Sequence, residues 1–217
     1  EIYKFSNDEF NNDKDGIYIG EMKNNIKDGY GMLHYKKDDK YIRMKYEGDF
    51  KNGDKEGKGI MYYNDGEIYE GDWKNNIYEG KGKMFFENGN RYEGEWKNSK
   101  KDGKGIFYFK NGNRYEGEYK NNEKDGKGIM YYKSGDRYEG DWKNGNREGK
   151  GVYYFNSGNR YEGDFKNNIF EGKGIYFYKD GDRFEGEYKN DEREGKGIMY
   201  YKDGKIKEGV WKNGKPL

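Results

Sequence analysis

Two acidic side chains separated by one residue recur along the chain, and Glu93 and Glu95 are a representative pair. Paired carboxylates could act as a general acid and base, or as ligands of a metal ion. A catalytic pair, however, needs its two carboxyl groups in unlike environments, so that their pKa values diverge. Here consecutive units carry the same pair beside lysine, which predicts a ladder of equivalent sites. We therefore expect that the protein is not an enzyme and has no catalytic residue, metal site or cofactor.

Two further features of the sequence resemble known chemical sites but lack the neighbouring residues that such sites need. His34 is the only histidine, and the chain has no cysteine that could share a metal ion with it. It occupies a strand position that holds Tyr or Phe in other units, so we expect it to pack there. The tripeptide Gly103-Lys104-Gly105 is not a phosphate loop, because no long glycine-rich turn leading into a helix N-terminus accompanies it.

A row of arginines offers two interpretations. One arginine precedes the aromatic residue of five consecutive units, at Arg91, Arg114, Arg137, Arg160 and Arg183. As structural residues they would pair with acidic side chains or stack on neighbouring rings, and we favour this role. As a binding site, a row of guanidinium groups spaced roughly 10 Å apart would meet phosphoinositide headgroups or an acidic partner.

All of these residues belong to a repeat with a period of 23 residues. The tripeptide Tyr-Glu-Gly begins at Tyr46, Tyr69, Tyr92, Tyr115, Tyr138 and Tyr161, and it continues in register as Phe184-Glu185-Gly186 and Lys207-Glu208-Gly209. A fixed period of this length indicates a repeat architecture in which each unit contacts mainly its neighbours.

Each unit has the pattern of a β-hairpin. In the unit 92–114, residues 92–96 alternate aromatic and acidic side chains, and residues 103–109 are rich in aromatic residues, so both segments are predicted strands. Residues 97–102 are polar and turn-prone, and Asn111-Gly112 predicts a tight turn. These connections are too short for parallel crossovers. We therefore predict an all-β fold: an elongated, single-layer antiparallel meander of hairpins that forms a twisted rod.

The two faces of this sheet differ in chemistry. We expect the glutamates that follow the repeated Tyr, such as Glu93, to lie near the lysines of Gly-Lys-Gly, such as Lys104, because opposite charges on neighbouring strands are favourable. The other face carries the aromatic rings and the glycines. Glycine there allows large rings to lie flat across the neighbouring backbone, so this face is the predicted core.

The composition limits the kinds of molecule that the chain is expected to bind. The 217 residues include 43 Lys and Arg against 42 Asp and Glu, and this balance gives no general attraction to nucleic acid. The absence of cysteine fits a reducing compartment. The chain shows no signal peptide and no apolar run of the length that a membrane span needs.

The pattern of Tyr-Glu-Gly-Glu-Trp, a short polar turn and Gly-Lys-Gly resembles the MORN repeat, and the resemblance covers almost the whole chain. It implies a ribbon of hairpins that serves as a protein-interaction or scaffolding module, with phospholipid binding as an alternative. The Asn- and Lys-rich, repeat-only chain is most similar to the MORN scaffold proteins of apicomplexan parasites. That similarity implies cytoskeletal partners, a role in cell division or budding, and a cytoplasmic, cytoskeleton-associated location at the cell periphery or inner membrane complex.

The predicted organisation is a single array over residues 1–217, with about nine units. The first unit, which begins at Tyr18, is degenerate and is followed by an insertion around Lys36–Lys45. Residues Glu1–Phe5 have the pattern of a second strand without its first, so we expect the array to open and close on half units. This pattern favours a C-terminal fragment of a longer repeat protein. A regulatory repeat domain of a larger enzyme is a further alternative.

The last unit departs from the repeat at two columns. The acidic residue two places after the repeated Glu becomes Val210, and the column of arginines ends in Ile206. The predicted strand Ile206–Trp211 therefore has an apolar, unprotected edge, with Pro216 beyond it, and such an edge favours a partner. We predict an antiparallel, tail-to-tail homodimer with Ile206, Val210 and Trp211 near the contact.

Overall fold

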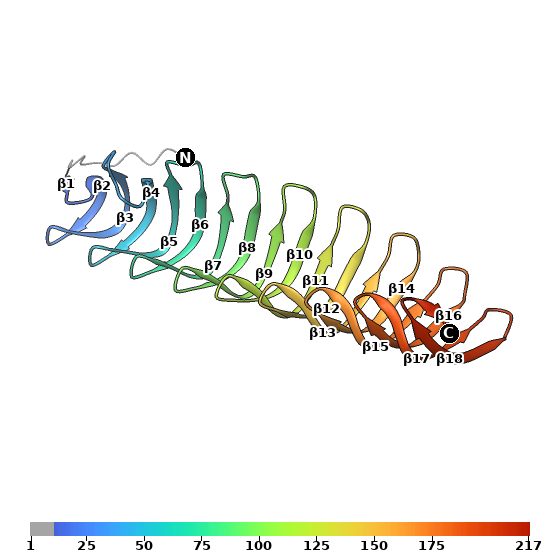
Figure 1. Ribbon diagram of the computed structural model, residues 1–217. Coiled ribbons are helices and arrows are strands. Elements are labelled where there is room, and N and C mark those ends of the chain that lie inside the picture. The colour runs from blue at the N-terminus through green and yellow to red at the C-terminus, as the bar shows by residue number, and fades with distance from the viewer. Residues whose placement is uncertain (1–10) are drawn as a thin grey trace. The chain divides into compact units, whose positions relative to one another are not determined.

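The computed structural model describes residues 11–217, which form 19 strands joined by turns and loops and contain no helix. They fall into two compact units, one ending at Lys110 and the other formed by Asn111–Leu217. Within each unit every strand pairs antiparallel with the strand that follows it (Figure 1). The predicted all-β, single-layer antiparallel meander of hairpins is therefore confirmed. The expectation for Glu1–Phe5 lies outside the described residues.

The first unit contains nine strands. They are β1 (Asn11–Asp13), β2 (Gly16–Lys23), β3 (Ile26–Tyr35), β4 (Arg43–Lys51), β5 (Asp54–Tyr63), β6 (Ile68–Lys74), β7 (Ile77–Phe85), β8 (Arg91–Lys97) and β9 (Lys100–Tyr108).

The second unit contains ten strands. They are β10 (Arg114–Lys120), β11 (Glu123–Tyr131), β12 (Arg137–Lys143), β13 (Asn146–Tyr154), β14 (Arg160–Lys166), β15 (Ile169–Phe177), β16 (Arg183–Lys189), β17 (Glu192–Tyr200), β18 (Ile206–Lys212) and β19 (Lys215–Pro216).

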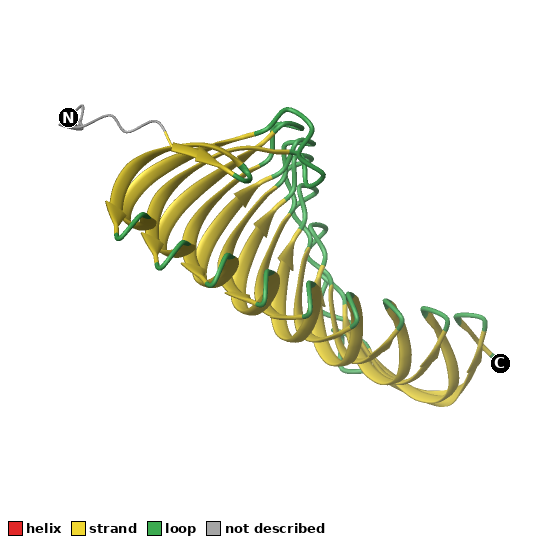
Figure 2. Cartoon of the chain, turned by 90° about the vertical axis from the view of Figure 1, so that its left-hand side faces the viewer, coloured by secondary structure: helices red, strands yellow, loops and turns green. Residues whose placement is uncertain are grey.

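Each hairpin is sharply bent, as the curved strands of Figure 2 show. Tyr69 and Trp73 are four residues apart on β6, which in a straight strand would separate their Cα atoms by about 13 Å. Their ring centroids are instead 5.4 Å apart, edge to face. Both rings therefore lie inside the bend, where a single-layer sheet gains a core of its own.

The bend is built around glycine and an irregular register. Between β6 and β7 the pairing shifts after Gly71 and resumes at Trp73, so that three residues of β7 face one residue of β6. Gly80 in this bulge has φ +87°, a left-handed conformation that glycine adopts without steric cost. The Asp72 carboxylate accepts the backbone N–H of Lys81 at 2.8 Å and fixes the bulge.

The tight hairpin turns differ from the prediction. Asn98 and Ser99 both have positive φ, which makes a two-residue turn of the primed type, and β9 begins immediately afterwards at Lys100. Residues 100–102 are therefore strand and not turn. The predicted turn at Asn111-Gly112 belongs to the longer loop between strands, with Gly112 in the left-handed region. Asparagine supports the tight turn because its short polar side chain tolerates positive φ.

The core consists of two rows of rings, as the sequence predicted. The first ring of each repeat is almost completely buried in Tyr18, Tyr46, Tyr69, Tyr92, Tyr115, Tyr138, Tyr161 and Phe184. The second ring is also buried in Phe50, Trp73, Trp96, Tyr119, Trp142, Phe165, Tyr188 and Trp211. A Cβ atom at Gly105 would lie 2.4 Å from the hydroxyl oxygen of Tyr92, so the glycines make room for the rings.

On the charged face the glutamates of the repeat lie on the same surface as the lysines of Gly-Lys-Gly, as predicted, but they are diagonal to these lysines and not directly opposite them. The lysine of Gly-Lys-Gly lies directly opposite the second acidic residue of the next strand and not the first: Lys150 pairs with Asp164. The side chains form an ion pair at 2.6 Å. The first acidic residue, such as Glu162, lies opposite an aliphatic residue, Val152. The alignment of Gly151 with Gly163 in this regular ladder sets the offset, which alternation along the sequence does not reveal.

Candidate interaction surfaces

The five arginines of the predicted binding ladder are engaged within the sheet. Each guanidinium lies over an aromatic ring on the neighbouring strand at 4.2–4.3 Å from the ring centroid, as Arg91 does over Tyr108. Four of them also form an ion pair with the glutamate two residues later, with Arg91–Glu93 at 3.1 Å and Arg160–Glu162 at 3.0 Å. The geometry supports the structural role, because these contacts hold each guanidinium against the sheet.

An open groove crosses the charged face in each unit. In the first unit it has a volume of about 650 Å³, and Glu70, Gly71, Lys81 and Gly82 contribute to its wall. In the second unit a groove of about 770 Å³ has equivalent lining and extends to Val210. Because acidic and basic side chains alternate along these walls, they present mixed charge to a partner.

A third column of side chains, which the sequence analysis missed, covers the aromatic core. The residue nine places after each repeated ring lies over that ring, at Lys27, Lys55, Tyr78, Lys101, Lys124, Arg147, Phe170 and Arg193. Tyr78 and Phe170 stack on their rings with centroids 3.6 and 3.8 Å apart, whereas the others place a cation over the ring. These residues fall in the segment predicted to be a turn, and their period of 23 residues is the sequence signal that identifies the column.

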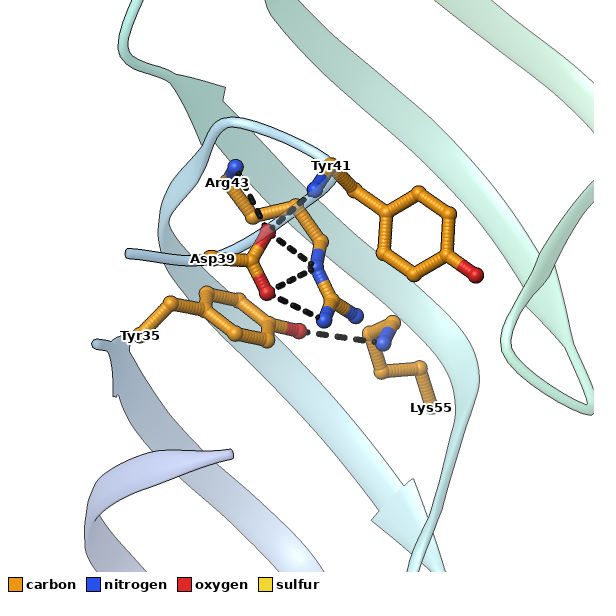
Figure 3. Close-up of polar contacts among 5 residues, drawn as sticks. All are labelled: Tyr35, Asp39, Tyr41, Arg43 and Lys55. Carbon is orange, nitrogen blue, oxygen red and sulfur yellow. Dashed lines mark hydrogen bonds and ion pairs between the residues drawn. The ribbon is translucent and has the colours of Figure 1, made fainter. Parts of the chain in front are cut away.

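Lys55 is the most enclosed member of this column. Its ammonium lies 5.5–5.8 Å from the ring centroids of Tyr35, Tyr46 and Trp73, and only 6% of the residue is exposed. The Tyr35 hydroxyl is 3.1 Å from the Lys55 nitrogen (Figure 3). Burial, with the Arg43 charge nearby, lowers the pKa of Lys55 to about 8.

One carboxylate organises the hydrogen bonds of the insertion between β3 and β4. The two oxygens of Asp39 accept the backbone N–H groups of Tyr41 and Arg43 and a bidentate pair of bonds from the Arg43 guanidinium, the shortest at 2.6 Å (Figure 3). These hydrogen bonds lower the pKa of Asp39 to about 2. The Arg43 guanidinium also lies over the rings of Tyr35 and Tyr41, at 4.1 and 5.0 Å.

The three predicted interface residues at the C-terminal edge differ in their exposure to solvent. Ile206 and Val210 are 65% and 46% exposed, whereas Trp211 is 2% exposed and packs against Phe184 at 4.9 Å. The strand β19 pairs with the end of β18, with Pro216 opposite Trp211. The expectation that Pro216 lies clear of the strand is therefore wrong, because the turn at Asn213-Gly214 returns the chain alongside β18.

The remaining candidate groups are not assembled into a site. His34 is exposed on β3, with its Nε2 atom 3.0 Å from the Met32 sulfur, so the packing expected of it is with Met32 at the surface. Among residues 11–217, no group of three or more His, Cys, Asp or Glu side chains is placed to bind a metal ion. The same residues include no helix with the length and apolarity that crossing a membrane requires.

Each structural unit contains a buried ring, two glycines beneath that ring and a bulge fixed by an acidic side chain. The signature of the MORN repeat matches this unit eight times. The matches cover residues 18–40, 46–68, 69–91, 92–114, 115–137, 138–160, 161–183 and 184–206. The chain belongs to the MORN repeat family. MORN repeats form protein-interaction or membrane-binding modules, so this chain is a repeat module of that kind.

Other comparisons are more distant. No curated protein matches the MORN chain. The TCP domain of SAS-4 (dCPAP) from Drosophila melanogaster, solved with a proline-rich motif of Ana2, is 15% identical, with 72% of this chain and 85% of that chain covered and a TM-score of 0.46. The TCP10 domain of Danio rerio CPAP, solved with a STIL peptide, is 13% identical, with 72% and 82% covered and a TM-score of 0.34. At these TM-scores neither similarity carries an argument about function.

Proposed function

We propose that this MORN-repeat chain is a structural scaffold that binds itself and other proteins and organises cytoskeletal or membrane-associated structures. The observation that carries the proposal is the repetition of one ion-paired surface, with the same residue types every 23 residues, in both units. A surface repeated in this way presents many equivalent contacts, and linked contacts strengthen binding without new chemistry. The expected setting is the cytoplasmic cell periphery, as in the apicomplexan MORN scaffolds, during division or budding.

Self-association is proposed to occur through β18 as an antiparallel, tail-to-tail homodimer. Ile206 and Val210 expose apolar surface on β18. The outer edge of this strand is covered by β19 at Trp211 and Lys212, and the Leu217 N–H donates to the Val210 carbonyl at 2.9 Å, so among the described residues the open part of the edge is 206–209. Exposed strand edges pair readily with another chain, and a two-fold axis makes the contact self-complementary. Trp211 would support this contact from the core beneath the strand.

Light scattering coupled to size exclusion tests the dimer. The unaltered chain should have twice the monomer mass, and Ile206→Lys and Val210→Lys should each shift it toward the monomer. Ile77→Lys, at an exposed apolar position of the first unit, serves as the matched control and should leave the dimer unchanged. A monomer at all concentrations would contradict self-association, and a dimer that survives both changes would place the interface elsewhere.

The scaffold role itself is tested in cells by proximity labelling from the chain. Labelling of cytoskeletal proteins at the cell periphery is expected, and it should weaken in the Val210→Lys variant if assembly is required. Labelling confined to unrelated soluble enzymes would contradict the proposal. The phosphoinositide alternative is less favoured, because the five arginines that would carry it are stacked on rings and four are paired with glutamate.

A further inference from the structure

The loop that joins β3 to β4 and the first residues of β4 carry three exposed apolar side chains. Tyr41, Ile42 and Met44 are each about half exposed, although they lie within four residues of one another. Large apolar side chains scattered singly on a surface need no explanation, whereas a cluster of them indicates a contact. The loop belongs to the insertion that interrupts the first repeat, so the repeat architecture does not require it.

The loop is held in a strained conformation. Ile42 has φ +54°, in the left-handed region that a β-branched residue rarely occupies. Its backbone N–H donates to the Asp39 carbonyl at 2.9 Å, and its own carbonyl accepts the N–H of Asn64 at 2.7 Å. Together with the Asp39–Arg43 pair, these bonds fix the loop. Strain of this kind persists where the surroundings impose it, and it is concentrated at functional segments.

Within residues 36–45 the exposed charges are predominantly positive. Lys36, Lys37 and Lys40 are exposed, and Asp38 is the one exposed carboxylate within residues 36–45. The charge of Asp39 is taken up by Arg43 at 2.6 Å. This local excess contrasts with the balanced charge of the whole chain.

We propose that residues 36–44, the β3–β4 loop and the start of β4, form a membrane-docking element that inserts Tyr41, Ile42 and Met44 into the interface of an anionic bilayer while the flanking lysines contact lipid headgroups. Interfacial binding combines buried apolar area with attraction between basic residues and anionic lipid, and tyrosine is typical of this depth. A bilayer is favoured over a protein partner because three side chains are far fewer than the 20–30 residues per side of a stable protein interface. The loop is distinct from the arginine ladder and from the β18 edge, so the proposal stands apart from homodimerisation.

Co-sedimentation with vesicles tests the docking element in the full chain. Binding is expected to vesicles of phosphatidylcholine mixed with phosphatidylserine and to be weak with phosphatidylcholine alone. The double variant Tyr41→Ser/Met44→Ser should reduce partitioning of the chain onto the vesicles about tenfold. The triple variant Lys36→Gln/Lys37→Gln/Lys40→Gln should reduce this partitioning mainly at low salt. The control Ile77→Ser/Phe85→Ser, at two other exposed apolar positions, should bind as the unaltered chain does.

A probe at the loop distinguishes insertion from contact elsewhere. Because the chain has no cysteine, a single Met44→Cys variant can carry an environment-sensitive fluorophore, and Ile77→Cys is its matched control. A blue shift on addition of anionic vesicles is expected at position 44 and not at position 77. Failure of the unaltered chain to bind the vesicles, or equal shifts at both positions, would overturn the proposal. Unchanged binding in the Tyr41→Ser/Met44→Ser variant would also overturn it. Vesicle binding is measured separately from the mass of the dimer, so this proposal and the proposed self-association can fail independently.

Discussion

The hydroxyl group of Tyr92 donates a hydrogen bond to the backbone carbonyl of Glu95, at 3.0 Å and only three residues further along β8. The strand must bend around the ring for the two groups to meet. The same bond recurs one repeat earlier, from Tyr69 to Asp72 at 2.9 Å, and one repeat later, from Tyr115 to Glu118 at 3.1 Å. The bond therefore couples the buried ring to the bend that creates the core, which explains why the tyrosine hydroxyl is retained in a fully buried position.

Removing and adding this hydroxyl should have opposite effects on stability. Tyr115→Phe should lower the free energy of unfolding by about 1 kcal/mol, because the Glu118 carbonyl loses its donor. Phe184 occupies the same ring position without a hydroxyl group, so Phe184→Tyr should raise stability by a similar amount. Chemical denaturation of the two variants measures both. Changes of the same sign would show that the hydroxyl does not contribute through this bond.

The glycines beneath the rings should be far less tolerant than the charges on the opposite face. A Cβ atom at Gly117 would lie 2.5 Å from the Gly128 Cα and 2.6 Å from the Tyr115 hydroxyl, so Gly117→Val should destabilise the fold by about 1–3 kcal/mol or more. Glu116→Gln removes one side of an exposed ion pair with Arg114 at 3.6 Å and should cost about 0–1 kcal/mol. Thermal melting compares them, and equal losses would contradict the assignment of the two faces.

Lys55 should make stability depend on pH in a narrow alkaline window. Its folded pKa is about 8, below its ordinary value of 10.5, so the unfolded chain binds more protons between these values and stability rises with pH there. The free-energy cost of burying the charged Lys55 side chain is fully present below pH 8. Lys55→Met should remove this penalty, on the order of 3 kcal/mol at pH 7, and flatten the rise.

The pH experiment has an upper limit set by the buried tyrosines. Burial raises the pKa of Tyr18 to about 12 and raises the pKa of Tyr46 further. The folded chain therefore retains protons that the unfolded chain loses above pH 10, and stability falls there. Denaturation between pH 7 and 9.5 isolates Lys55, and a rise that persists in Lys55→Met would assign it to another group.

The arginine ladder should contribute to stability and not to lipid binding. Replacing Arg91, Arg114, Arg137, Arg160 and Arg183 by glutamine removes five cation–π contacts worth about 0.5–1 kcal/mol each at exposed sites. The melting temperature should fall while flotation with phosphoinositide vesicles is unchanged. Loss of flotation in a variant that remains folded would instead identify the ladder as the lipid site.

The sequence alone determined the repeat, the alternation of faces and the ring-and-glycine core, because each follows from local patterns of period two and period 23. The pairing of Lys150 with Asp164 and the position of Lys55 over the rings were decided by the tertiary structure. The first follows from the alignment of Gly151 with Gly163 in the ladder between β13 and β14, which has no bulge. The second depends on the glycine bulge between β4 and β5, after which Lys55 lies opposite Phe50. The conformation of Ile42 likewise depends on Asp39 and Asn64, whose bonds to the loop form only once the neighbouring hairpin is in place. Local periodicity specifies which residues face one another across a regular sheet, whereas bends and insertions are fixed by contacts between segments distant in sequence.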